Sequence, residues 1–229
     1  MKRFWKEVAV TADNGIALDG RPVRTPGRAG LIAPTAALAD AIAGEWRDVG
    51  ETLDPRAMPL TGLSNAAIDR IAPDPLPHAL GLAAYGESDL LVYRADSPPA
   101  LVERQAAAWD PPLGWARARY DVHFTLASGV MHRPQPPATL ARLGDAVAAL
   151  DAWRLAGLTP VVTITGSLVL GLALVEGAIE ADAAWAAAQV DEDWQAEHWG
   201  EDALAAQARA NRRADYDAGI RFLATLDAA

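Results

Sequence analysis

The chain has 229 residues, of which 51% are apolar and 22% charged, enough to bury a sizeable core in one large domain or two small ones. It contains no cysteine, which excludes disulfides, thiolate metal sites and a cysteine nucleophile. The formal net charge of −10 argues against nucleic acid or anionic lipid as partners, because both require a basic surface.

The first part of the chain, residues 4–33, carries the signals of short β-strands. Apolar residues alternate imperfectly from Trp5 to Val10, and hairpin-turn sequences follow at Asp13-Asn14-Gly15 and at Asp19-Gly20. Short apolar runs lie between the turns, so we expect three or four antiparallel strands. The basic first ten residues lack the apolar stretch of a secretory signal.

After residue 33 the apolar period changes from strand-like to helical. Thr35 can cap a helix in which Leu38, Ile42 and Trp46 share one face, and we expect Trp46 to anchor that helix in the core. A second helix is predicted from a cap at Thr61.

That second helix is predicted to end at Ile71, where proline-rich residues interrupt regular structure. We place a domain boundary there. The prediction is an α+β protein with a small antiparallel β-rich N-terminal domain, residues 1–73 with one or two helices, and a larger all-helical C-terminal domain, residues 74–229.

Beyond the boundary the pattern is mainly helical. Ser97-Pro98-Pro99 predicts a helix start, and Asp110-Pro111-Pro112 is expected to interrupt that helix. Residues 89–94 fit a strand or a helix, and residues 123–130 fit a short strand or a turn. Further helices are predicted from about residue 137 and from Asp202 to Leu226.

The longest apolar run extends from Val161 to Val175, about 15 residues, whereas a bilayer requires roughly 20. We therefore expect no membrane insertion. The run predicts one helix that is buried on all sides, with the rest of the domain around it.

The segment after this run is acidic between Asp191 and Asp202 and contains Trp194 and Trp199. Tryptophan is a typical interface anchor, and a ring beside carboxylates suits a partner that is apolar with a basic rim. The two tryptophans are five residues apart, so we expect one in the core and one nearer the surface. The candidate partner-binding residues are Glu192, Trp194, Glu197, Trp199, Glu201 and Asp202.

Two other interpretations of the acidic segment stay open. The carboxylates can form a solvated face, or they can serve an enzyme that acts on a small basic or sugar substrate. Catalysis would require carboxylates in unlike environments, facing a deep pocket.

Motifs for phosphate binding and for a zinc helix are absent. His123 and His132 are nine residues apart, with no acid between them, so we expect no metal and no cofactor.

Several stretches together resemble the assembly chaperone of the F-type ATP synthase alpha subunit, in the right order and over nearly the whole chain. They include RFWKEVAV, IALDGRPVRTP, APTAALADAIAGEW, MPLTGLSNAAIDR, ESDLLVYRA, Gln105, Trp109-Asp110-Pro111, GSLVLGLAL, Gln195 and Trp199-Gly200.

The resemblance implies a chaperone and not an enzyme. It would bind the free alpha subunit, without using ATP, and shield the surface that the beta subunit later covers. The functionally critical acid of the family follows the Trp-Gly pair, which here leaves both Glu201 and Asp202 as candidates. The resemblance also implies a bacterial, cytoplasmic protein, since the chain opens directly on RFWK, and we expect a monomer.

Overall fold

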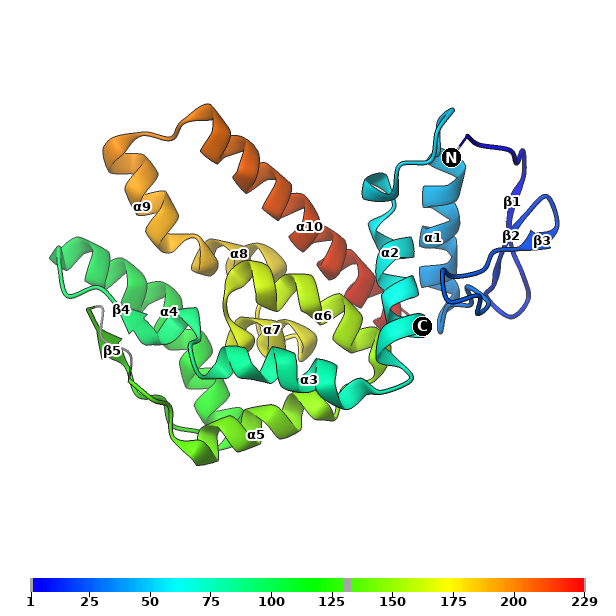
Figure 1. The fold of residues 1–229 in the computed structure, drawn as a ribbon. Helices are drawn as coiled ribbons and strands as arrows, with labels where there is room; N and C mark the ends of the chain where they lie inside the picture. Colours follow the sequence, from blue (N-terminus) through cyan, green and yellow to red (C-terminus); the bar gives the residue numbers. More distant parts are fainter. Residues whose placement is uncertain (1, 130–132, 229) are drawn as a thin grey trace. The chain divides into compact units, whose positions relative to one another are not determined.

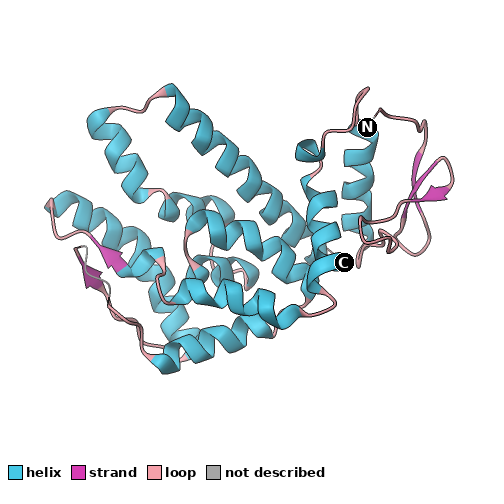
Figure 2. Cartoon of the chain, viewed as in Figure 1, coloured by secondary structure: helices cyan, strands magenta, loops and turns pink. Residues whose placement is uncertain are grey.

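The computed structural model describes residues 2–129 and 133–228, and helices dominate it (Figure 2). Two compact units account for the chain. The first comprises Met1–Pro75, Asp151–Leu158 and Asp215–Ala229, and the second comprises Leu76–Leu150 and Thr159–Ala214. The predicted α+β class is confirmed, with a small antiparallel sheet near the N-terminus followed by a largely helical remainder. No helix in the described ranges combines the length and apolar character needed to cross a bilayer.

The first unit contains the predicted β-rich segment. Strands β1 (Val8–Val10), β2 (Ile16–Leu18) and β3 (Arg21–Pro22) pair antiparallel in the order β1-β2-β3. The turns hold Asn14 at a φ of 62° and Asp19 at a φ of 47°, a left-handed conformation that these two residue types tolerate. The hairpin-turn residues therefore fix where the strands reverse.

Helix α1 (Ala36–Asp48) begins where the sequence predicts, because the Thr35 hydroxyl accepts a hydrogen bond from the Leu38 amide at 3.2 Å. Trp46 is only 8% exposed, and its carbonyl accepts a hydrogen bond from the Trp5 indole at 3.3 Å. The helix packs on β1 and β2, so the predicted core position of Trp46 is confirmed.

The predicted cap of the second helix is wrong. After a short 3-10 turn, η1 (Pro55–Ala57), helix α2 spans Pro59–Ala66 and continues into a π-helical turn, η2 (Ala67–Ile71). The buried Glu45 carboxylate of α1 accepts the Leu60 amide at 2.7 Å and the Thr61 amide at 2.8 Å. A side chain from another helix thus caps α2, and the helix begins at Pro59, before the predicted cap at Thr61.

Segments from late in the chain complete the first unit. Helix α6 (Ala152–Thr165) begins in this unit, and its Trp153 ring stacks on Phe222 at 6.1 Å between centroids. The Thr35 hydroxyl donates to the Thr225 carbonyl at 2.7 Å. The domain boundary at residue 73 stays a prediction. The first unit also includes residues 151–158 and 215–229, which the prediction placed in the C-terminal domain.

The second unit is mainly helical and holds the remaining elements. They are α3 (Pro75–Ala83), η3 (Ala84–Gly86), η4 (Leu90–Val92), β4 (Tyr93–Arg94), α4 (Pro99–Tyr120), β5 (Ala127–Ser128), α5 (Pro137–Ala148), α7 (Leu168–Val175), α8 (Ala181–Ala188), α9 (Val190–Trp199) and α10 (Ala203–Asp227), of which α10 extends into the first unit. β4 and β5 pair in parallel, so both ambiguous segments contain a short strand. His132 and Val130 lie outside the described residues.

The long apolar run forms two helices, so the prediction of a single helix is wrong. Gly166 ends α6 at a φ of 66°, and the Ser167 hydroxyl caps α7 by accepting from the Leu170 amide at 3.0 Å. The first six residues of α7 are buried, as predicted for this run.

Asp89, the residue before η4, is fully buried against the start of α7, and its carboxylate accepts a hydrogen bond from the Val169 amide at 2.9 Å. Its burial raises its pKa to about 6.

Helix α4 runs without interruption through Pro111 and Pro112, which contradicts the predicted break. Proline lacks an N–H, so two hydrogen bonds to carbonyls one turn earlier are absent. Burial offsets this loss, because Trp109 and Leu113 are 0% exposed where α4 packs on α7 and α8.

Candidate partner-binding surface

The acidic, tryptophan-containing segment, residues 191–202, forms α9 from its second residue onward and the turn that follows it. Gly200 follows α9 at a φ of 81°, and the chain then turns back into α10 (Figure 1). Glycine suits this turn because a side chain there would be strained. We call residues 190–208, from α9 through the first turns of α10, the arm.

Most carboxylates of α9 are already paired within the second unit. The Arg104 guanidinium binds both oxygens of Glu197, at 2.7 and 2.8 Å. Arg212 lies 2.5 Å from Glu192, and Arg209 lies 2.5 Å from Asp193. Glu192 therefore joins α9 to α10, and Glu197 joins α9 to α4.

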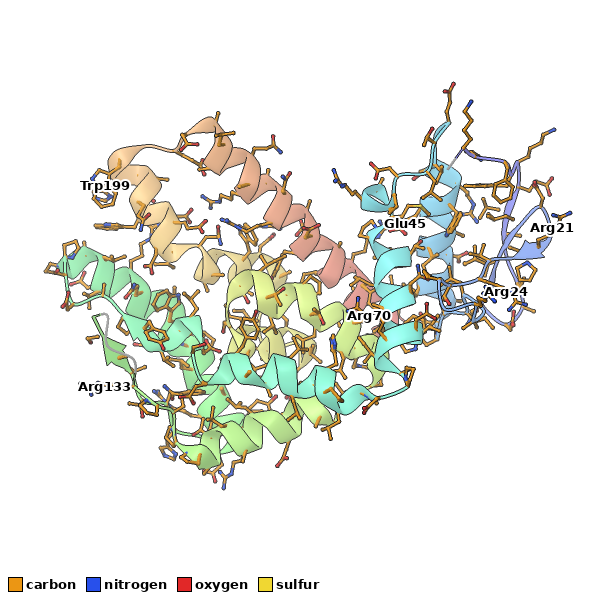
Figure 3. All side chains as sticks on the ribbon, viewed as in Figure 1. Arg21, Arg24, Glu45, Arg70, Arg133 and Trp199 are labelled. Carbon is orange, nitrogen blue, oxygen red and sulfur yellow. The ribbon has the colours of Figure 1, made fainter. Side chains whose placement is uncertain are left out.

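The tip of the arm, residues 199–204, is where apolar side chains face solvent. Trp199 is 76% exposed and Leu204 is 84% exposed, the two highest values for large apolar side chains among the described residues. Figure 3 shows Trp199 projecting from the end of α9. Large apolar groups left in water at one place are typical of an interaction surface.

The two candidate acids of the tip differ in what they contact. Asp202 caps α10, since its carboxylate accepts the Ala205 amide at 2.8 Å. Glu201 is exposed and, within the described part of the chain, makes no hydrogen bond or ion pair. Glu201 is therefore the carboxylate that is free to meet a partner.

A slot of about 300 Å³ separates α9 from the first turns of α10. Its lining includes three predicted residues, Glu192, Glu201 and Asp202, and the small side chains of Ala196 and Ala205. Trp199 lies at the tip beside this slot, so the structure brings together four of the six candidates.

The other two candidates lie elsewhere. Glu197 faces α4, where Arg104 binds it. Trp194 is half-buried and stacks on His198, with 4.1 Å between ring centroids and 27° between planes. Neither tryptophan of α9 is in the core, which corrects the expectation that one would be.

Sequence reasoning missed Leu204, the most exposed large apolar residue of the described chain. The sequence does contain a signal of this exposure. Along the helix, Leu204 has only alanine and polar neighbours, so it belongs to no apolar stripe that would bury it. The arginine that binds α9 from α4, Arg104, lies 93 residues before Glu197 in sequence, and no local pattern links the two.

This arrangement suits binding rather than catalysis. The tip offers an exposed ring, an exposed leucine and a free carboxylate, while the neighbouring acids are engaged in ion pairs. In residues 2–129 and 133–228 no group of three or more His, Cys, Asp or Glu side chains is placed to hold a metal ion.

Comparison with known proteins agrees with this interpretation. Residues 2–117 match the family model of the ATP12 chaperone protein. The chain is 25% identical over 214 residues to "Protein atp12, mitochondrial" of Schizosaccharomyces pombe, covering 87% of this chain and 74% of that protein.

Solved structures are also similar to the chain. Atp12 from Paracoccus denitrificans is 44% identical, with a TM-score of 0.90 over 98% of this chain and 97% of that one. The D202K mutant of P. denitrificans Atp12p gives a TM-score of 0.91, at 44% identity and the same coverage. The Atu1473 protein of Agrobacterium tumefaciens is 42% identical, with a TM-score of 0.91 over 99% of this chain and 86% of that one. The chain belongs to the ATP12 chaperone family, and it is an ATP synthase assembly chaperone rather than an enzyme.

Proposed function

We propose that this chaperone binds the free alpha subunit of F-type ATP synthase and shields its beta-facing surface, without ATP, until the catalytic ring assembles. The observation that carries the proposal is the tip of the arm, where Trp199 is 76% and Leu204 84% exposed beside the unpaired Glu201. A folded protein gains nothing by keeping such side chains in water unless another surface covers them.

The physical reason for such a chaperone lies in the partner. A subunit that awaits assembly exposes the apolar surface that its neighbour will later bury, and this surface promotes aggregation. A chaperone that covers it through a small tip can be displaced by the larger permanent interface, because obligate interfaces are larger and more apolar than transient ones.

Within the tip we assign the charged contact to Glu201. Its carboxylate would meet a basic group of the alpha subunit and so set register and association rate more than total affinity. Asp202 has a different task, because its carboxylate caps α10 and thereby fixes where the turn ends.

Co-expression with the alpha subunit tests the proposal. We expect soluble alpha subunit only when this chain is present, and we expect Glu201→Lys to weaken its capture while the thermal unfolding midpoint is unchanged. Changing Glu201 and Asp202 together to lysine should weaken capture further, with a small loss of stability from the missing cap, about 1 kcal/mol.

Glu51→Lys is a matched control, because it makes the same charge change at an exposed position of the first unit. Equal capture by the Glu201→Lys and Glu51→Lys chains would remove the assignment of Glu201. Absence of soluble alpha subunit with the wild-type chaperone would remove the proposal itself.

We further propose that the chain acts as a monomer in the bacterial cytoplasm. The structural relatives that are 42–44% identical come from bacteria. Size-exclusion chromatography at two concentrations tests the oligomeric state, and an elution volume that shifts with concentration would contradict a monomer.

A further inference from the structure

We propose that Arg104 and Gln105 of α4 are positioning residues that set the direction in which the arm points. This inference rests on the proposed function only in so far as the arm is the surface that meets the alpha subunit. Neither residue touches the tip, and each acts through a carboxylate of α9.

Helix α9 has little apolar packing of its own. Val190, at its first position, is its only buried residue among those described, whereas six residues of the shorter α7 are buried. A helix without a buried apolar stripe has no hydrophobic contact to fix its direction. Polar contacts must therefore decide where α9 points.

Gln105 supplies the contact at the start of α9. It is 2% exposed, and its side-chain amide donates to the Asp191 carboxylate at 2.7 Å. Its side-chain carbonyl accepts the Ala95 amide at 2.8 Å, just after β4. Both ends of this buried side chain are thus satisfied, which makes its geometry specific and its loss costly.

Arg104, the adjacent residue, supplies the contact at the far end of α9. It binds both oxygens of Glu197 at 2.7 and 2.8 Å and lies 3.9 Å from Asp193. Residues 191 and 197 are separated by about 9 Å along a helix axis. Two contacts at this separation fix a direction, which a single contact cannot do.

A third contact on α4 holds the preceding helix. The Trp109 indole, 0% exposed, donates to the Ala187 carbonyl at 2.7 Å. This carbonyl lies near the end of α8, two residues before the joint at Gln189. One face of α4 thus holds both sides of the α8–α9 joint.

The arginines of α10 play a different part. Arg209 and Arg212, on α10 just after the arm, bind Asp193 and Glu192, so they join α9 to the returning helix. They cannot orient the pair relative to α4. Loss of the α4 contacts is therefore expected to release the arm as a unit while its two helices stay together.

Two substitutions, one that breaks the contact between residues 105 and 191 and one that restores it, test the inference. Gln105→Glu places a second carboxylate opposite Asp191, at a position now separated by 2.7 Å, and repulsion should push α9 away. Adding Asp191→Asn should restore the contact, because the new amide can donate to the new carboxylate. Asn211→Asp, at an exposed position of α10 outside the arm, is the matched control for charge alone.

Hydrogen exchange followed by mass spectrometry gives a readout that does not depend on the partner. In the Gln105→Glu chain we expect exchange of residues 190–199 to rise at least tenfold, while α7 stays protected. Capture of the alpha subunit should fall in parallel, and the double variant should recover both.

Unchanged exchange in the Gln105→Glu chain, or no recovery in the double variant, would overturn the inference. Equal loss of protection in α7 and α9 would also overturn it, because Gln105 would then support the whole unit and not the direction of the arm. If the exchange pattern appears as expected but even the wild-type chain fails to capture the alpha subunit, the proposed function fails and the positioning role stands.

Discussion

Replacing Trp199 by alanine should weaken capture of the alpha subunit strongly and leave the chaperone as stable as before. A tryptophan side chain presents on the order of 200 Å² of surface. At 76% exposure, roughly 150 Å² is available for a partner to cover. At about 25 cal/mol per Å², complete burial would contribute up to about 4 kcal/mol. Incomplete burial lowers this, so we expect a loss of about 2–4 kcal/mol, or roughly 30- to 1,000-fold in Kd.

The assay is titration of purified alpha subunit with the wild-type and Trp199→Ala chains, followed by light scattering or by isothermal calorimetry. Phe4→Ala is the matched control, because this aromatic ring is 67% exposed and lies in the first unit. The unfolding midpoint should stay the same in both variants, since neither side chain is buried. A Trp199→Ala chain that binds as tightly as the Phe4→Ala chain would refute the argument that the exposed ring is an anchor.

Two further predictions concern the scaffold. Asp89 holds a proton in the native chain up to about pH 6, whereas its ordinary pKa is 3.8. Its contribution to the unfolding free energy therefore falls by about 3 kcal/mol as pH rises from about 4 to about 6. Denaturant titrations should show this decline relative to Asp89→Asn, and parallel curves for the two chains would contradict it. Gly27→Ala should destabilise by about 1–3 kcal/mol, because a Cβ there would lie 2.6 Å from the Asp69 carboxylate that binds the Gly27 amide. Gly62→Ala, with open space at its Cβ, is the control, and equal melting temperatures would contradict the steric argument.

Local signals in the sequence predicted the elements whose ends are set by nearby residues. Thr35 marks the start of α1, and Asp202 marks the start of α10, because each caps its own helix. The β-turn residues Asn14 and Asp19 likewise mark the ends of the strands, because they adopt the left-handed conformation of the turns themselves. At each of these positions, the group that decides the structure lies within a few residues of the one it affects.

Elements set by distant residues could not be predicted in this way. Helix α2 starts at Pro59 because Glu45, on another helix, accepts its first amides. Helix α4 continues through two prolines because buried contacts outweigh two lost hydrogen bonds. Gly166 divides the apolar run into two helices, but the stretches on both sides of it are rich in apolar residues, so the run looked continuous in the sequence. Of the tip, the sequence predicts Trp199, Glu201 and Asp202 as candidates. It predicts neither Leu204 nor the pairing of α9 with Arg104.

The membership of the first compact unit has a consequence for synthesis of the chain. Residues 215–229 belong to it together with residues 1–75, and contacts such as the one between Thr35 and Thr225 close the unit. The ribosome makes these late residues long after it has made the amino-terminal segment. That segment therefore stays without part of its folding partners during synthesis, and the first unit can close only once the late residues have left the exit tunnel.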